Sequence, residues 1–72
     1  MKYLGTFKVM GNGVMGDGFT FTSKRTAIKT MRKIAMGNAT PTNNVVVEVS
    51  NADNVVYRAM IAKSGYTILM QS

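Results

Sequence analysis

Residues 23–37 constrain the fold most, because their apolar side chains recur at helical rather than strand spacing. At about 100° per residue, these side chains fall within one arc of about 120°, as on a helix that lies against a core. The apolar stripe consists of Ala27, Ile28, Met31, Ile34 and Ala35. We expect this stripe to be buried.

The residues that flank the segment indicate where the helix begins and ends. A hydroxyl at Thr22 or Ser23 can accept hydrogen bonds from the free N–H groups of a first helical turn. Gly37 and Asn38 suit the left-handed conformation that often follows a last turn. We therefore predict a helix over residues 24–36.

The same segment carries five of the nine basic residues of the chain and no acidic residue. Four of them share a helical face beside the apolar stripe: Arg25, Lys29, Arg32 and Lys33. Like charges four residues apart, such as Arg25 and Lys29, destabilise a helix by roughly 0.2–0.5 kcal/mol per pair. Solvated helices usually avoid this cost by interleaving glutamate with lysine. We therefore interpret the stripe as a surface that contacts a partner, against the alternative of a merely solvated face.

The rest of the chain shows the two-residue alternation of half-buried strands, interrupted by turn residues. Two glycine-rich turns within residues 11–18 predict a hairpin with a long tip. Strands are predicted at residues 2–10, 19–21, 45–50, 55–63 and 66–71, with tight turns at residues 51–54 and 64–65. The order ββαβββ is typical of an α+β fold, in which one amphipathic helix packs on one face of an antiparallel sheet. We predict a single domain over residues 1–72.

Alternation also assigns each strand residue to one of the two faces of the sheet. The face of the sheet that the helix covers should carry the aromatic residues of the first hairpin together with Val45, Val47, Val49, Val55, Tyr57, Ala59, Ile61, Tyr66, Ile68 and Met70. The outer face should mix apolar with charged residues, namely Leu4, Met10, Val46, Val56, Met60 and Leu69 among Lys2, Lys8, Glu48 and Arg58. So apolar an outer face indicates either a dimer or partner surface or simply a small domain short of polar residues, and of the two we favour a second contact surface. We add Lys8 and Arg58 to the predicted binding residues.

Net charge and hydropathy limit the choice of partners. A formal net charge of +6 and a pI near 10.1 favour polyanions, namely nucleic acid, an acidic protein surface or anionic lipid. No apolar run approaches the ~18 residues that span a membrane. The N-terminal residues lack the apolar core of a secretory signal. We therefore expect a cytoplasmic protein without a membrane partner.

Catalysis and metal binding have few residues to draw on, since the chain has no cysteine and no histidine. Asp17 and Asp53 lie in predicted turns, and Glu48 stands alone in a strand, so no acid/base pair is expected. Residues 11–16 match G-x-G-x-x-G, but a predicted strand follows instead of the helix that this phosphate-binding motif requires. We expect a non-enzymatic protein without cofactor or metal.

A hairpin, a basic helix opened by Thr22 and Ser23, and an antiparallel meander over residues 45–50, 55–63 and 66–71 follow one another along the chain. This element order resembles that of small phage-encoded inhibitors, including some anti-CRISPR proteins. The resemblance covers the element order of the whole chain and assigns no role to individual residues. It implies a non-enzymatic protein that blocks or redirects a host macromolecule.

We therefore expect a small basic binding protein, phage-encoded, that inhibits or modulates a host protein or nucleoprotein complex by occupying an acidic surface. One alternative is nucleic-acid binding without sequence preference, dominated by backbone phosphates. Because Tyr3, Tyr57 and Tyr66 are predicted to point into the core, this alternative lacks a stacking platform for bases. The other alternative is a homo-oligomeric structural protein, such as a homodimer, whose apolar outer face pairs with itself.

Overall fold

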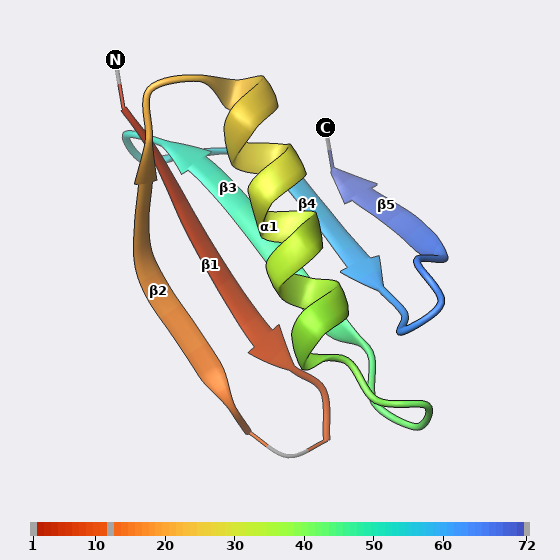
Figure 1. The fold of residues 1–72 in the computed structure, drawn as a ribbon. Helices are drawn as coiled ribbons and strands as arrows, with labels where there is room; N and C mark the ends of the chain where they lie inside the picture. The colour runs from red at the N-terminus through yellow and green to blue at the C-terminus, as the bar shows by residue number, and fades with distance from the viewer. Residues whose placement is uncertain (1, 12, 72) are drawn as a thin grey trace.

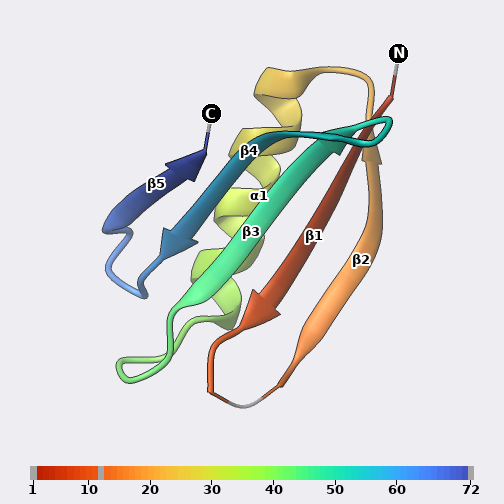
Figure 2. The same ribbon diagram turned by 180° about the vertical axis from the view of Figure 1, so that it is seen from behind.

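The computed structural model describes residues 2–11 and 13–71, with the backbone alone at Asp17. One helix and five strands follow in the predicted order: β1 (Tyr3–Val9), β2 (Met15–Phe21), α1 (Lys24–Asn38), β3 (Val45–Asn51), β4 (Asn54–Ile61) and β5 (Thr67–Gln71). The strands form one sheet in the order β2-β1-β3-β4-β5, and all neighbouring strands are antiparallel. Helix α1 lies across one face (Figure 1), and the opposite face of the described sheet carries no helix (Figure 2). The predicted α+β fold is confirmed.

The helix begins where the sequence predicts and ends two residues later, at Asn38. Ser23 is the N-cap, with an extended backbone (φ −129°, ψ 132°) and a hydroxyl that accepts a hydrogen bond from the Thr26 N–H at 3.4 Å. The predicted left-handed ending is wrong, because Gly37 and Asn38 are both helical. The Asn38 side-chain amide donates to the Ile34 carbonyl at 2.8 Å. The chain then leaves the helix through Ala39, which has an extended backbone (φ −75°, ψ 151°) and whose N–H donates to the Ala35 carbonyl at 2.8 Å.

The core lies between α1 and the sheet, mainly over β1 and β3. Its buried apolar residues are Val9, Ala27, Met31, Ala35, Ala39, Val45, Val47, Val49, Tyr57, Ala59 and Ile61. Two alanines on the buried stripe, Ala27 and Ala35, let the helix backbone approach the strands closely. Ile28 and Ile34 are predicted to be buried with them but are only partly buried, because they flank the line of closest approach.

Two glycines of the first hairpin leave room for large side chains. Met31 is the largest fully buried side chain of the helix and lies over Gly5. A methyl group at Gly5 would lie 2.5 Å from Met31 Sδ, 2.8 Å from Met31 Cγ and 3.1 Å from Phe21 Cε2. The ring of Phe7 covers Gly16 on the neighbouring strand in the same way. Glycine at these positions therefore allows the helix and the aromatic rings to lie directly on the hairpin.

The tip of the first hairpin is shorter than predicted. Residues 16–18, predicted as a second turn, lie within β2, so that prediction is wrong. Opposite residues 5–7 of β1, β2 holds one extra residue, which is a β-bulge, and Gly18 adopts φ +85° there. The glycines thus serve a bulge rather than a turn. Asn12, in the middle of the first predicted turn, lies outside the described residues.

The side chains of strand β5 lie on the opposite faces of the sheet from those that alternation predicts. Leu69, predicted on the outer face, pairs with the buried Ala59 on the side of the helix. Tyr66, Ile68 and Met70, predicted in the core, are exposed to 69%, 49% and 51%. The turn at residues 62–66 sets this facing, because it places Thr67 opposite the buried Ile61, and a shift of one residue exchanges the two faces of a strand. The backbone of α1 does not pack on β5, so no core selects one face of this strand.

A second irregularity changes the facing at the start of β4. The register shifts where Val55 lies opposite Ser50. Val55, predicted in the core, is only partly buried, whereas Val56, predicted on the outer face, packs against the core. The strand also ends at Ile61, before the predicted end at Lys63. Both differences arise from the pairing of β3 with β4, which the pattern of one strand does not encode.

Candidate functional site

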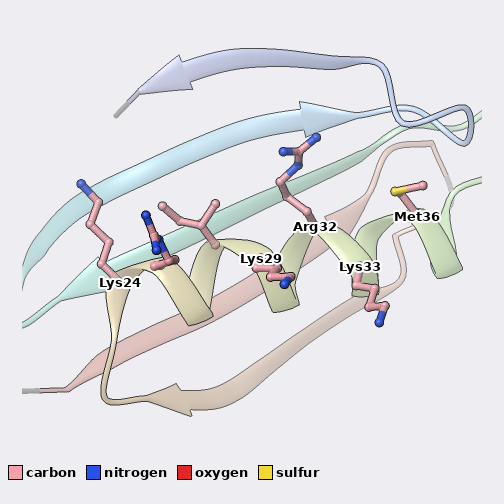
Figure 3. Close-up of a pocket in the computed structure, with 7 residues that line it drawn as sticks. Lys24, Lys29, Arg32, Lys33 and Met36 are labelled. Atoms are coloured by element: carbon pink, nitrogen blue, oxygen red, sulfur yellow. The ribbon is translucent and has the colours of Figure 1, made fainter.

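The exposed side of α1 carries the four cations that the sequence predicts as a binding stripe. Arg25, Lys29, Arg32 and Lys33 are all exposed, and Lys24 joins them at the start of the helix. In Figure 3, Lys24 and Arg32 point toward β4 and β5, whereas Lys29 and Lys33 point away from these strands. We call these five residues the basic face of α1.

The basic side chains border an open groove with an apolar floor. The groove has a volume of about 770 Å³ and is lined by Lys24, Arg25, Ile28, Lys29, Arg32, Lys33 and Met36. Its floor consists of the partly buried Ile28 and of Met36, which is exposed to 39%. This floor is not predicted from the sequence, where Ile28 is assigned to the core. The available signal was the position of Met36, which falls at the angle of the basic stripe on a helical wheel.

Within the described residues, no acidic side chain forms an ion pair with the basic face. The one ion pair found in that part of the chain joins Arg58 and Glu48. The first turn of α1 contains no acidic residue, although the helix dipole favours one there. Arg32 donates to the neutral hydroxyl of Thr67 at 3.2 Å. The basic face therefore retains the positive potential that attracts carboxylates or phosphates.

The structure separates Lys8 and Arg58 from the basic face. Both lie on the outer face of the sheet, with Lys8 opposite Val46 and Arg58 opposite Glu48. Arg58 donates through Nε (3.1 Å) and Nη2 (2.9 Å) to Glu48 Oε2. A carboxylate of the same chain thus already holds Arg58, whereas Lys8 is exposed beside a hollow of about 460 Å³. The six predicted binding residues therefore belong to two surfaces on opposite sides of the sheet.

The carboxylates whose side chains are described do not gather into a site. Glu48 is engaged by Arg58, and Asp53 lies in the turn between β3 and β4. The side chain of Asp17 lies outside the described part of the structure. No group of three or more histidine, cysteine, aspartate or glutamate residues there could hold a metal ion. None of the described helical structure is long and apolar enough to cross a membrane.

Two residues that line the groove, Arg32 and Met36, also lie close to β5 or to the turn that precedes it. Arg32 reaches Thr67 at the start of that strand, and a methyl group at Gly65 would lie 3.6 Å from Met36 Cε. Leu69 lies on the same side of the sheet and is exposed to 55%. Since α1 packs on β1 to β4 and not on β5, only the ends of long side chains bridge the space between helix and edge strand.

The chain matches no protein-family model, no curated protein and no solved structure. Its function is therefore argued from the chemistry of these surfaces.

Proposed function

We propose that this chain is a small, non-enzymatic binding protein that docks on an acidic surface of a larger protein or nucleoprotein complex. The observation that carries the proposal is the groove along α1, where uncompensated cations border an apolar floor of Ile28 and Met36. Protein interfaces combine these two elements: an apolar centre excludes water, and charges around it set orientation and association rate.

The biological effect of such docking would be to inhibit or modulate the partner. A domain of this size without catalytic groups acts by covering a surface that another molecule needs. This role agrees with the resemblance of the element order to small phage-encoded inhibitors, and the protein would exercise it in the cytoplasm of the host cell.

Nucleic-acid binding without sequence preference is the second candidate, and one observation favours it. Tyr66 is exposed rather than buried, so an aromatic ring is available on which a base could stack. The apolar floor of the groove, however, has no counterpart in a sugar-phosphate backbone, which is contacted mainly by cations and hydrogen-bond donors. An acidic protein surface therefore remains the first candidate.

The two candidates are separated by fluorescence anisotropy at about 0.15 M salt with two labelled probes. One probe is an acidic peptide of about 18 residues, built from glutamate, leucine and alanine so that the leucines share one helical face. The other is a random DNA duplex of about 20 base pairs. We expect the peptide to bind at least about tenfold more tightly than the duplex. Tighter binding of the duplex, with a slope of log affinity against log salt near −3, would instead support the nucleic-acid candidate.

A pair of charge reversals tests whether the basic face is responsible. Lys29→Glu with Lys33→Glu changes the basic face, and Lys2→Glu with Lys63→Glu makes the same change in net charge at exposed positions elsewhere. We expect the first pair to weaken peptide binding by more than about tenfold and the second by less than about threefold. Far-UV circular dichroism should be unchanged in both. Equal losses would reduce the effect to overall net charge and overturn the proposal.

A further inference from the structure

The sheet is wider than its one helix can cover. Five strands at the usual spacing of about 4.8 Å place the two edge strands about 19 Å apart, whereas a helix with its side chains is about 10 Å across. Helix α1 packs mainly on β1 and β3, less on β2 and β4, and not on β5. Strand β5 therefore lies beyond the strands on which α1 packs (Figure 1).

We call the groove of α1, together with the helix-side surface of β5 beside it, the notch. Ile28, Arg32 and Met36 line the groove on the helix. On the strand, Thr67 is contacted by Arg32, and Leu69 lies on the same side of the sheet. Leu69 is exposed to 55% although it faces the side of the core. An apolar side chain in this position is half covered by its own chain and leaves its other half for a partner.

Along the notch, residues of α1 lie beside residues of β5 at matching intervals. Met36 lies near Gly65, and Arg32 contacts Thr67. Four residues of a helix rise about 6.0 Å, and two residues of a strand rise about 6.6 Å. Four residues further toward the start of the helix and two further along the strand, Ile28 should therefore lie level with Leu69. The notch thus has apolar side chains on both walls, with the Arg32 guanidinium between them.

We propose that the notch seats an acidic amphipathic helix of the partner protein, lying beside α1. Its apolar residues would cover Ile28, Met36 and Leu69. Its carboxylates would meet cations that line the groove, namely Arg25, Lys29 and Lys33. This proposal rests on the proposed function and specifies the element of the partner that docks. Neighbouring helices pack with axes about 8–10 Å apart, so a helix beside α1 would lie above β4 and β5. An amphipathic helix in an apolar groove is also a recurrent mode of recognition.

Charge selects this occupant over a second copy of the chain. A second α1 in the notch would bring one basic face against another, and α1 contains no acidic residue that could compensate. Repulsion between the cations therefore opposes self-association through this surface, whereas glutamate or aspartate on the incoming helix pairs with them.

The test compares the acidic amphipathic peptide described above with a peptide of identical composition whose leucines are scattered around the helix. We expect the amphipathic peptide to bind at least about tenfold more tightly and to gain helicity by circular dichroism on binding. Leu69→Ser should weaken its binding by about tenfold and leave the scattered peptide unaffected. Leu4→Ser is the matched control, because Leu4 is exposed to 41% on the outer face of the sheet. It should change neither affinity.

The outcomes distinguish this inference from the proposed function. If the two peptides bind equally and both lose binding when the charges of Lys29 and Lys33 are reversed, the inference of a helix in the notch is overturned. The proposal of an acidic partner on the basic face then stands. The same holds if Leu69→Ser and Leu4→Ser behave alike. Binding of neither peptide, or binding insensitive to the charge reversal, would overturn the proposed function itself. Concentration-dependent dimerisation that Leu69→Ser abolishes would replace the partner helix by a second copy of the chain.

Discussion

Replacing Gly5 by alanine tests the packing of α1 on the sheet at its tightest point. Gly5 is buried in β1, and its added methyl group would lie 2.5 Å from Met31 Sδ and 2.8 Å from Met31 Cγ. Met31 cannot swing away into solvent, because it is fully buried, and Phe21 closes the site at 3.1 Å. Either the helix or the Met31 side chain must therefore move.

The magnitude follows from two opposing contributions. Overpacking a well-packed core costs about 1–3 kcal/mol, and replacing glycine by alanine in a strand returns about 0.5–1 kcal/mol of backbone entropy. We expect a net loss of about 1–2 kcal/mol. For a domain of this length the total free energy of unfolding is about 4–11 kcal/mol, so the loss corresponds to a decrease in Tm of about 5–15 °C.

Thermal and urea unfolding followed by far-UV circular dichroism measure this loss. Gly37→Ala is the matched control, because its methyl group would meet no atom within 4 Å and Gly37 is helical. It should raise stability by up to about 1 kcal/mol. Met31→Ala alone should cost about 2–5 kcal/mol, and less when Gly5→Ala partly fills the cavity. Wild-type stability of Gly5→Ala, or strict additivity of the two substitutions, would refute the contact between Gly5 and Met31.

Three further substitutions test the helix and the outer face by the same unfolding measurements. Ile34→Ala should cost about 1–2 kcal/mol, below the range for a fully buried isoleucine, because Ile34 is only partly buried; a loss above 4 kcal/mol would show a buried side chain. Ser23→Ala should cost about 0.5–1 kcal/mol, since the Thr26 N–H loses a long, exposed hydrogen bond; no change would show that the cap contributes nothing. Glu48→Gln should cost less than about 1 kcal/mol and less still in high salt, because the side chains of Arg58 and Glu48 are 39% and 35% exposed. A larger, salt-independent loss would contradict this assignment.

The sequence predicts best the elements whose pattern is long and whose partner is the core. The helical spacing of Ala27, Met31 and Ala35 places all three correctly, because only one face of a helix can be buried against a sheet. Val47 and Val49 of β3 are placed correctly for the same reason, since β3 is the central strand.

The edge strand shows where this reasoning fails. Alternation in β5 is ambiguous, because Ile68, Leu69 and Met70 are apolar in succession and either face could point inward. The facing is set by the turn that precedes β5, which places Thr67 opposite Ile61 in the pairing with β4. No periodicity within the strand records the length of that turn.

The proposed binding surface likewise has one part that can be predicted from the sequence and one part that cannot. The cations of α1 are found from the sequence, because a helix fixes the relative directions of its side chains locally. The pairing of Arg58 with Glu48 needs the register of β3 against β4, and the notch needs the width of the sheet relative to the helix. Leu69 is therefore a proposed binding residue that only the tertiary structure brings to notice.

The different treatment of charge on the two faces connects stability with binding. On the outer face Arg58 is held by Glu48, whereas on α1 the pairs Arg25–Lys29 and Lys29–Lys33 each cost roughly 0.2–0.5 kcal/mol. One glutamate at position 29 would turn both repulsions into attractions and stabilise the free protein. The chain carries lysine there instead, beside the apolar floor of the groove. Carboxylates of a partner would remove the same repulsion on binding, so the free energy that folding loses along α1 is recovered in the complex. A merely solvated face offers no such recovery, which is why the unpaired cations favour an acidic partner.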